Sequence, residues 1–183
     1  MRVIAGSARR LLLKSLPGND TRPTTDRIKE TLFNIINDDL YGGIFIDLFA
    51  GSGGIGIEAL SRGAKEAVFI EKNRNAVSVI KDNLVHTHLD SQAKVICGDV
   101  VSAIDRLREY DHIDIVYMDP PYAAEIEAEV LKNLAKLPGI DSDTMIIIEA
   151  DIKRDFAFVA DLDYTVTREK TYKTNKHVFL SKS

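Results

Sequence analysis

Residues 45–60 contain the pattern that most restricts how this chain can fold. A short apolar run that begins at Phe45 is typical of a buried strand, and the glycine-rich stretch after it predicts a tight turn. Residues 57–60 then predict a helix. Gly51, Gly53 and Gly56 have the GxGxxG spacing of dinucleotide-binding turns, so we expect a nucleoside-containing cofactor beside them. The spacing alone does not identify that cofactor.

The following residues alternate between strand and helix patterns. Branched apolar runs predict further strands at 67–70, 94–97, 113–118 and 144–148, and helical spacing of apolar residues follows each of the first three. This alternation predicts an α/β, Rossmann-like fold with a mostly parallel sheet and helices on both faces.

The two ends of the chain have a different pattern. Residues 2–5 and 11–14 predict a β-hairpin, which a helix with apolar positions between residues 28 and 36 follows. Near the other end, residues 164–167 and 177–180 predict a terminal antiparallel hairpin.

The length of the chain predicts one domain over residues 1–183. Within it, residues 1–40 would form an N-terminal hairpin and helix extension, and residues 41–183 the cofactor-binding and catalytic core. No apolar run approaches the roughly 20 residues of a membrane span, and the start lacks a signal-peptide pattern. The single cysteine, Cys97, fits a reducing cytoplasm. Neither the histidines nor Cys97 have the spacing of a metal site.

Charge is distributed unevenly along the sequence. The net charge is −4, but residues 1–30 and residues 164–183 each carry +4, so residues 31–163 carry −12. Basic ends around an acidic body are typical of a localised polyanion-binding face, and equally of solubilising surface charge.

Acidic residues occur at four successive strand ends. Asp47 lies within the predicted glycine turn, and Glu71, Asp99 and Asp119 follow the next three strands. Ligands of open α/β sheets bind beyond the carboxyl ends of the strands. Glu71 lies 20 residues after Gly51, where an acid can accept hydrogen bonds from ribose hydroxyls. Taken alone, each acid could be a helix cap, and for Asp99 we favour that interpretation.

The tetrapeptide at residues 119–122 indicates the chemistry. Pro120 and Pro121 make the backbone rigid and remove two N–H donors, which leaves carbonyl oxygens and the Asp119 carboxylate as acceptors. Tyr122 could stack on a flat ligand. Such a site suits a planar substrate with an exocyclic amino group, because the acceptors stabilise positive charge that develops on its nitrogen. The alternative is a simple Pro-Pro turn after a strand.

A second group of polar residues precedes the first predicted helix. Arg22, Thr24, Arg27 and Glu30 gather near the helix start, away from much of its apolar stripe. They form either a functional surface or a capped, solvated helix face.

Together these motifs resemble a known family. Residues 47–53, Glu71, residues 98–99 and residues 119–122 are similar to the S-adenosylmethionine-dependent amino-methyltransferases. The Arg-Pro-Thr-Thr-Asp-Arg stretch at 22–27 and the overall length resemble the bacterial RsmD-type 16S rRNA (guanine-N2)-methyltransferases. This resemblance implies methyl transfer from S-adenosylmethionine to guanine N2 in 16S rRNA, within the small ribosomal subunit.

The resemblance also implies roles for individual residues. The implied cofactor-binding set is Asp47, Phe49, Gly51, Ser52, Gly53, Glu71 and Asp99. The implied catalytic set, around the target guanine, is Asp119, Pro120 and Tyr122. The substrate-binding set is Arg22, Thr24, Arg27, Arg9, Arg10 and Lys173, of which the first three could contact either cofactor or RNA phosphate. We expect a monomer without metal.

Three other functions remain open at this point. The DPPY-type tetrapeptide also occurs in adenine amino-methyltransferases, which act on DNA or RNA. A nicotinamide-dependent dehydrogenase could use the same glycine spacing, but it gives residues 119–122 no role. A non-catalytic RNA-binding module would use the basic ends alone.

Overall fold

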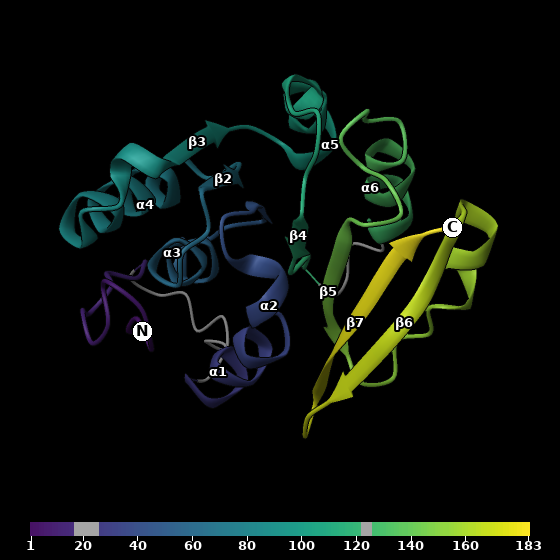
Figure 1. Ribbon diagram of the computed structural model, residues 1–183, viewed down its shortest axis with the longest axis horizontal. Coiled ribbons are helices and arrows are strands. Elements are labelled where there is room, and N and C mark those ends of the chain that lie inside the picture. The colour runs from purple at the N-terminus through teal and green to yellow at the C-terminus, as the bar shows by residue number, and fades with distance from the viewer. Residues whose placement is uncertain (17–25, 122–125) are drawn as a thin grey trace.

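The computed structural model describes residues 1–16, 26–121 and 126–183. Its strands form one seven-stranded sheet in the order β3-β2-β1-β4-β5-β7-β6 (Figure 1). The strands are β1 (Ile44–Leu48), β2 (Glu66–Glu71), β3 (Ala93–Cys97), β4 (Ile115–Met118), β5 (Met145–Asp151), β6 (Tyr164–Thr171) and β7 (Asn175–Lys182). The first five are parallel, and β7 pairs antiparallel with both β5 and β6. The predicted Rossmann-like fold and terminal antiparallel hairpin are therefore confirmed.

Helices connect the strands and cover the sheet. They are α1 (Asp26–Ile35), α2 (Asn37–Leu40), α3 (Gly54–Ser61), α4 (Arg74–Thr87), α5 (Val100–Ala103) and α6 (Glu127–Leu134), with short 3₁₀ helices η1 (Asp90–Gln92), η2 (Ile104–Glu109) and η3 (Ala157–Leu162). The strand order reverses between β1 and β4, because β2 and β3 extend the sheet on one side and β4 and β5 on the other. Open α/β folds bind ligands at this reversal.

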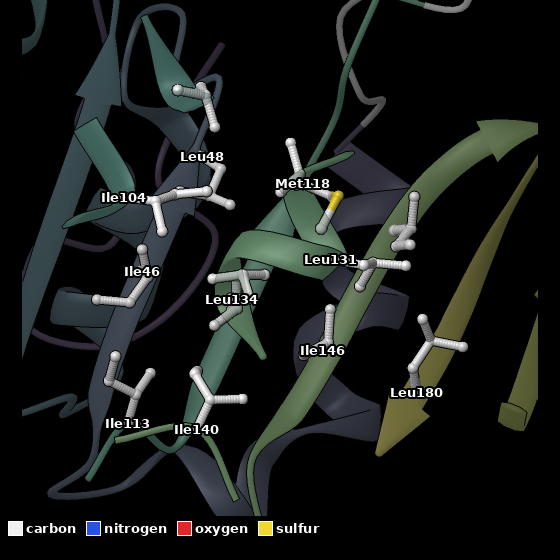
Figure 2. Packing of buried hydrophobic residues seen from close by; sticks show 14 of the residues in the cluster. Ile46, Leu48, Ile104, Ile113, Met118, Leu131, Leu134, Ile140, Ile146 and Leu180 are labelled. Atoms are coloured by element: carbon white, nitrogen blue, oxygen red, sulfur yellow. The ribbon is translucent and has the colours of Figure 1, made fainter. Parts of the chain in front are cut away.

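The core has two parts because successive residues of a strand point to opposite faces of the sheet. On one face, Ile46 and Met118 pack with Leu131 of α6 (Figure 2). On the other face, Phe45 and Tyr117 belong to a second cluster with apolar residues of α1, α3 and α4. Both faces of the parallel strands are thus buried, which explains why their sequences are apolar almost throughout.

Two elements differ from the sequence prediction. The single helix expected around residues 101–107 is α5 followed by the 3₁₀ helix η2. Ile104 and Leu107 are both buried, and in a 3₁₀ helix residues three apart share one face. The fifth strand was expected to end at residue 148, but β5 continues to Asp151 because β7 pairs with it as far as Asn175.

The N-terminal hairpin is present in a short form. Arg2 and Leu12 make one antiparallel bridge, and the Val3 N–H donates to the Leu11 carbonyl at 3.0 Å. The hairpin packs along α3, where the Glu58 carboxylate accepts the N–H groups of Ile4 at 2.8 Å and Ala5 at 3.0 Å.

A buried ion pair joins this hairpin to two helices. Lys29 of α1 lies 3.1 Å from Glu58 of α3, and neither side chain is exposed. The Lys29 ammonium also donates to the Arg2 carbonyl at 2.6 Å. Burial lowers the pKa of Lys29, although the Glu58 charge opposes this shift. Glu58 therefore holds hairpin, α1 and α3 together.

We predict that Glu58→Ala lowers the free energy of unfolding by about 3–5 kcal/mol, because it leaves the buried Lys29 ammonium without an opposite charge and two backbone N–H groups without their acceptor. The matched control is Asp82→Ala, which removes an exposed ion pair with Lys14 and should cost less than about 1 kcal/mol. Urea denaturation measures both values. Equal losses in the two variants would contradict the role assigned to Glu58.

Candidate functional site

The carboxyl ends of β1 and β4 bring the two main sequence motifs together. Leu48 and Met118, the last residues of these strands, are direct partners in the parallel ladder. Phe49 and Asp119 therefore leave the sheet side by side, and Asp119 is exposed to solvent. The structure thus places the glycine-rich turn and the Asp119 motif at one position on the sheet edge, where the strand order reverses.

The glycine-rich turn between β1 and α3 has an unusual backbone. Gly51 and Gly53 have φ angles of +55° and +81°, which favour glycine. Phe49 also has a positive φ, of 65°, and non-glycine residues in this conformation are typical of functional sites. Among the described residues, no atom lies within 4 Å of a Cβ atom added at Gly51, so none of them covers the backbone here. This is the surface that a ligand could approach closely.

Glu71 at the end of β2 stabilises this turn. One carboxylate oxygen accepts the Gly51 N–H at 2.9 Å, and the other accepts the Asn73 N–H at 2.8 Å. N–H groups in a turn before a helix can bind a ligand, but that of Gly51 is already bonded within the protein. A carboxylate has about four acceptor positions, so Glu71 can still accept hydrogen bonds from ribose hydroxyls.

Asp47 occupies a different position from the one expected. It lies inside strand β1 rather than in the turn, because the strand continues to Leu48. Its buried carboxylate accepts the N–H of Gly56, the third residue of α3, at 2.9 Å. Burial raises the pKa of Asp47 to about 7; the Gly56 hydrogen bond opposes this shift and the Glu71 charge adds to it. Asp47 therefore fixes the start of α3 at the sheet edge.

Asp99 caps a helix, as its sequence context favoured. Its carboxylate accepts the Val101 N–H at 3.0 Å at the start of α5. The residue is exposed at the end of β3, next but one to β1 in the sheet. It can therefore accept a further hydrogen bond from a ligand on this edge.

Asp119, at the end of β4, has a raised pKa. The protein around its carboxyl group removes part of its hydration, even though the residue as a whole is exposed, and this desolvation raises its pKa to about 8. The nearby charges of Glu149 and Asp47 raise it further in the same direction. Pro120 is buried directly behind Asp119. Tyr122 lies outside the described residues.

The sequence analysis did not identify a buried hydrogen-bonded cluster around Glu149, next to Asp119. Tyr117 of β4 donates its hydroxyl to Glu149 of β5 at 2.7 Å, and Asn175 of β7 donates to the other Glu149 oxygen at 2.7 Å. His177 Nε2 lies 3.3 Å from Glu149. Glu149 follows the fifth strand-like run, so the pattern of acids at strand ends could have indicated it. The pairing of His177 with Glu149 could not be seen in the sequence.

The structure separates the basic residues predicted to bind substrate. Arg9 and Arg10 lie within the turn of the N-terminal hairpin. The Ser7 N–H of this turn donates to the carbonyl of Ser61, the last residue of α3. That end of α3 points away from the glycine-rich turn. Lys173 lies between β6 and β7, near the carboxyl end of β5 (Figure 1). Arg27 is exposed in the first turn of α1.

Arg22 and Thr24, two of the residues predicted to bind substrate, lie outside the described residues.

Within the described residues, no group of three or more histidine, cysteine, aspartate or glutamate side chains could hold a metal ion. No helix in that part of the chain is long and apolar enough to cross a membrane.

Known proteins resemble this chain over nearly its full length. A family model described as Conserved hypothetical protein 95 matches residues 1–181. Ribosomal RNA small subunit methyltransferase D from Haemophilus influenzae is 33% identical over 172 residues, covering 93% of this chain and 88% of that protein. The protein of the same name from Escherichia coli K12 is 32% identical, covering 93% and 84%. The solved structure of Escherichia coli YhhF, provisionally named a methyltransferase, has a TM-score of 0.83 at 29% identity and covers 100% of this chain and 97% of that one.

We predict that Asp47→Asn makes the protein more stable relative to wild type as pH rises. The folded-state pKa of Asp47 is about 7, above the usual value of about 4. The folded state therefore holds this proton more tightly, and wild-type stability falls as pH rises through that interval. Asparagine does not titrate and can still accept the Gly56 N–H.

Thermal unfolding at pH 5 and pH 8 measures this effect. The Tm of Asp47→Asn relative to wild type should increase by about 2 °C or more between the two conditions. A Tm difference that is the same at both pH values would show that Asp47 does not titrate abnormally in the folded protein.

Proposed function

We propose a function from the premise that this chain belongs to the Conserved hypothetical protein 95 family. Its resemblance to the RsmD-type methyltransferases, first indicated by residues 22–27 and 119–122, is confirmed. We infer that it transfers a methyl group from S-adenosylmethionine to the exocyclic N2 of a guanine in 16S rRNA of the small ribosomal subunit. The observation that carries this proposal is the position of Asp119, which leaves β4 beside the glycine-rich turn.

The residues at the sheet edge fit S-adenosylmethionine. None of the described residues covers the Gly51 backbone, which suits close approach of the methionine part along Asp47, Phe49 and residues 51–53. Glu71 would accept hydrogen bonds from the ribose hydroxyls, and Asp99 from the adenine amino group. The pKa values of Asp47 and Asp119 are raised in the free protein, and a positive sulfonium bound beside them would favour their ionised, negative forms.

The chemistry of the protein residues centres on Asp119. S-adenosylmethionine, when bound, supplies an electrophilic methyl group whose bonding electron pair stays on the departing sulfur. The N2 lone pair of guanine is delocalised into the ring, so N2 is a weak nucleophile. Acceptance of N2–H hydrogen bonds by Asp119 and the Pro120 carbonyl would stabilise positive charge on N2 as its lone pair bonds to carbon.

A proton must then leave the methylated nitrogen. Asp119 is suited to accept it in its ionised form, because a carboxylate whose pKa is raised to about 8 binds a proton more tightly than an ordinary carboxylate does. Its exposure allows the proton to pass on to solvent. The target guanine must be turned out of its RNA surroundings to reach this edge, and Tyr122 would stack on it.

The proposal also covers the location of the protein, its oligomeric state and its contacts with RNA. We propose a cytoplasmic monomer of one domain that uses no metal. The basic residues Arg9, Arg10, Arg27 and Lys173 would contact RNA phosphates, which adds affinity but little sequence information. Because the N-terminal hairpin and the β6–β7 turn lie apart, these contacts would extend over a broad surface of the ribosomal particle.

We predict that Asp119→Ala reduces methyl transfer by about 100-fold or more, because it removes the acceptor for the developing charge. Affinity for S-adenosylmethionine should change less than about threefold, since the turn, Glu71 and Asp99 remain. Tritiated methyl transfer to undermodified small subunits and calorimetry with the cofactor measure the two quantities. Parallel loss of cofactor binding and transfer would instead assign Asp119 a structural role.

A further inference from the structure

A buried carboxylate that the proposed chemistry does not use lies next to Asp119. Glu149 of β5 accepts hydrogen bonds from Tyr117 and Asn175, each at 2.7 Å, and lies 3.3 Å from His177 Nε2. Burial would raise the pKa of Glu149, but hydrogen bonds from His177, Tyr117 and Asn175 outweigh it and lower the pKa. Glu149 is therefore an ionised group inside the protein, to which three side chains of the described residues donate.

The sheet register places this group on the same face as Asp119. Tyr117 is the ladder partner of Asp47 on one side and of Ile147 on the other. Glu149, two residues beyond Ile147, shares that face because side chains alternate along a strand. Asp119, two residues beyond Tyr117, leaves the sheet on the same side. Three carboxylates from β1, β5 and the end of β4 thus converge on the carboxyl edge of one face.

The same carboxylate holds the terminal hairpin at this edge. His177 is the direct antiparallel partner of Glu149, and Asn175 is that of Asp151. The Tyr172 hydroxyl lies 3.2 Å from His177 Nδ1, and the two rings meet edge to face at 5.2 Å. With Nε2–H donating to Glu149, a neutral His177 accepts the Tyr172 hydroxyl at Nδ1. The turn of the hairpin, which bears Lys173, is therefore connected to Glu149 through His177.

We propose that Glu149 is a positioning residue for methyl transfer, which holds Tyr117 and the β6–β7 hairpin beside Asp119 and adds a fixed negative charge there. This inference rests on the proposed function. It assigns Glu149 no contact with substrate or cofactor.

The desolvation penalty of the buried Glu149 charge supports a positioning role in methyl transfer over a purely structural role. Apolar cross-strand pairs hold antiparallel strands in register without the desolvation penalty of an ionised group. Here the Glu149 charge lies where the proposed reaction creates positive charge, so it would stabilise the transition state and offset the free energy lost by desolvation. The described ionisable groups that face Asp119 are Asp47 of β1, Tyr117 of β4 and Glu149 of β5, with His177 of β7 behind Glu149.

The test uses Glu149→Gln in the full chain. Glutamine keeps the shape but carries no charge. Its single carbonyl oxygen can still accept from Tyr117, while its NH₂ group takes the place of the oxygen that accepts from Asn175 and can pair there with the Asn175 amide oxygen once that amide turns over. We expect the pKa of Asp119, followed by carboxyl-carbon NMR in the free protein, to fall by about half a pH unit or more. We expect kcat for methyl transfer to fall by about tenfold or more, with unchanged affinity for S-adenosylmethionine.

Two further variants make the result specific. Tyr164→Phe removes a buried hydroxyl that donates to the Leu131 carbonyl at 3.0 Å on the other face of the sheet, so it should lower Tm without changing the Asp119 pKa or kcat. Tyr172→Phe keeps Glu149 and the ring contact with His177 but removes the hydroxyl that lies against His177 Nδ1, and it should lower kcat by a smaller factor. It also replaces Glu149→Gln as the test if that variant does not fold.

An unchanged Asp119 pKa in Glu149→Gln would overturn the proposal, as would an unchanged kcat in both Glu149→Gln and Tyr172→Phe. A loss of kcat that the Tyr164→Phe control reproduces would overturn it too. Failure of the proposed function is a separate result: the wild-type protein would then methylate no RNA, while the NMR titration would still show whether Glu149 controls Asp119.

Discussion

Electrostatic repulsion among acids at one edge of the sheet is the constraint around which this site is organised. Asp47, Asp119 and Glu149 converge where the strand order reverses, and the first two have raised pKa values. Glu149 stays ionised because three side chains donate to it. Such an arrangement is costly in the free protein. A cationic ligand would lower its free energy, and the proposed methyl donor carries its positive charge on the reacting group.

The surrounding fold supports the glycine-rich turn on two sides. Glu71 and Asp47 hold its backbone from the sheet, through the N–H groups of Gly51 and Gly56. From outside, the N-terminal hairpin packs along α3: a Cβ atom at Gly54 would overlap the Met1 side chain, and Glu58 binds hairpin backbone. The N-terminal extension therefore contributes to the stability of the helix that follows the turn.

Much of the fold and the site edge follows from local sequence pattern. Apolar runs and helical spacing identified the five parallel strands, and the acids after β2, β3 and β4 indicated the edge because parallel strands end together. The pairing of Glu149 with His177 was not predictable, since it joins residues 28 apart through the antiparallel register of β5 and β7. The separation of Arg10 from Lys173 also depends on tertiary packing, which net charge does not show. Asp47 was misplaced because the strand runs closer to the glycines than its sequence suggests.

The account depends on hydrogen-bond acceptors at the edge of the sheet, which hold an aromatic amine while a sulfonium donor methylates it. Its most direct test is mass spectrometry of nucleosides from small ribosomal subunits incubated with the wild-type protein and S-adenosylmethionine, followed by mapping of the modified position. The account predicts N2-methylguanosine at one nucleotide of 16S rRNA. Methylated adenosine, or a methyl group on an oxygen or ring carbon, would contradict it.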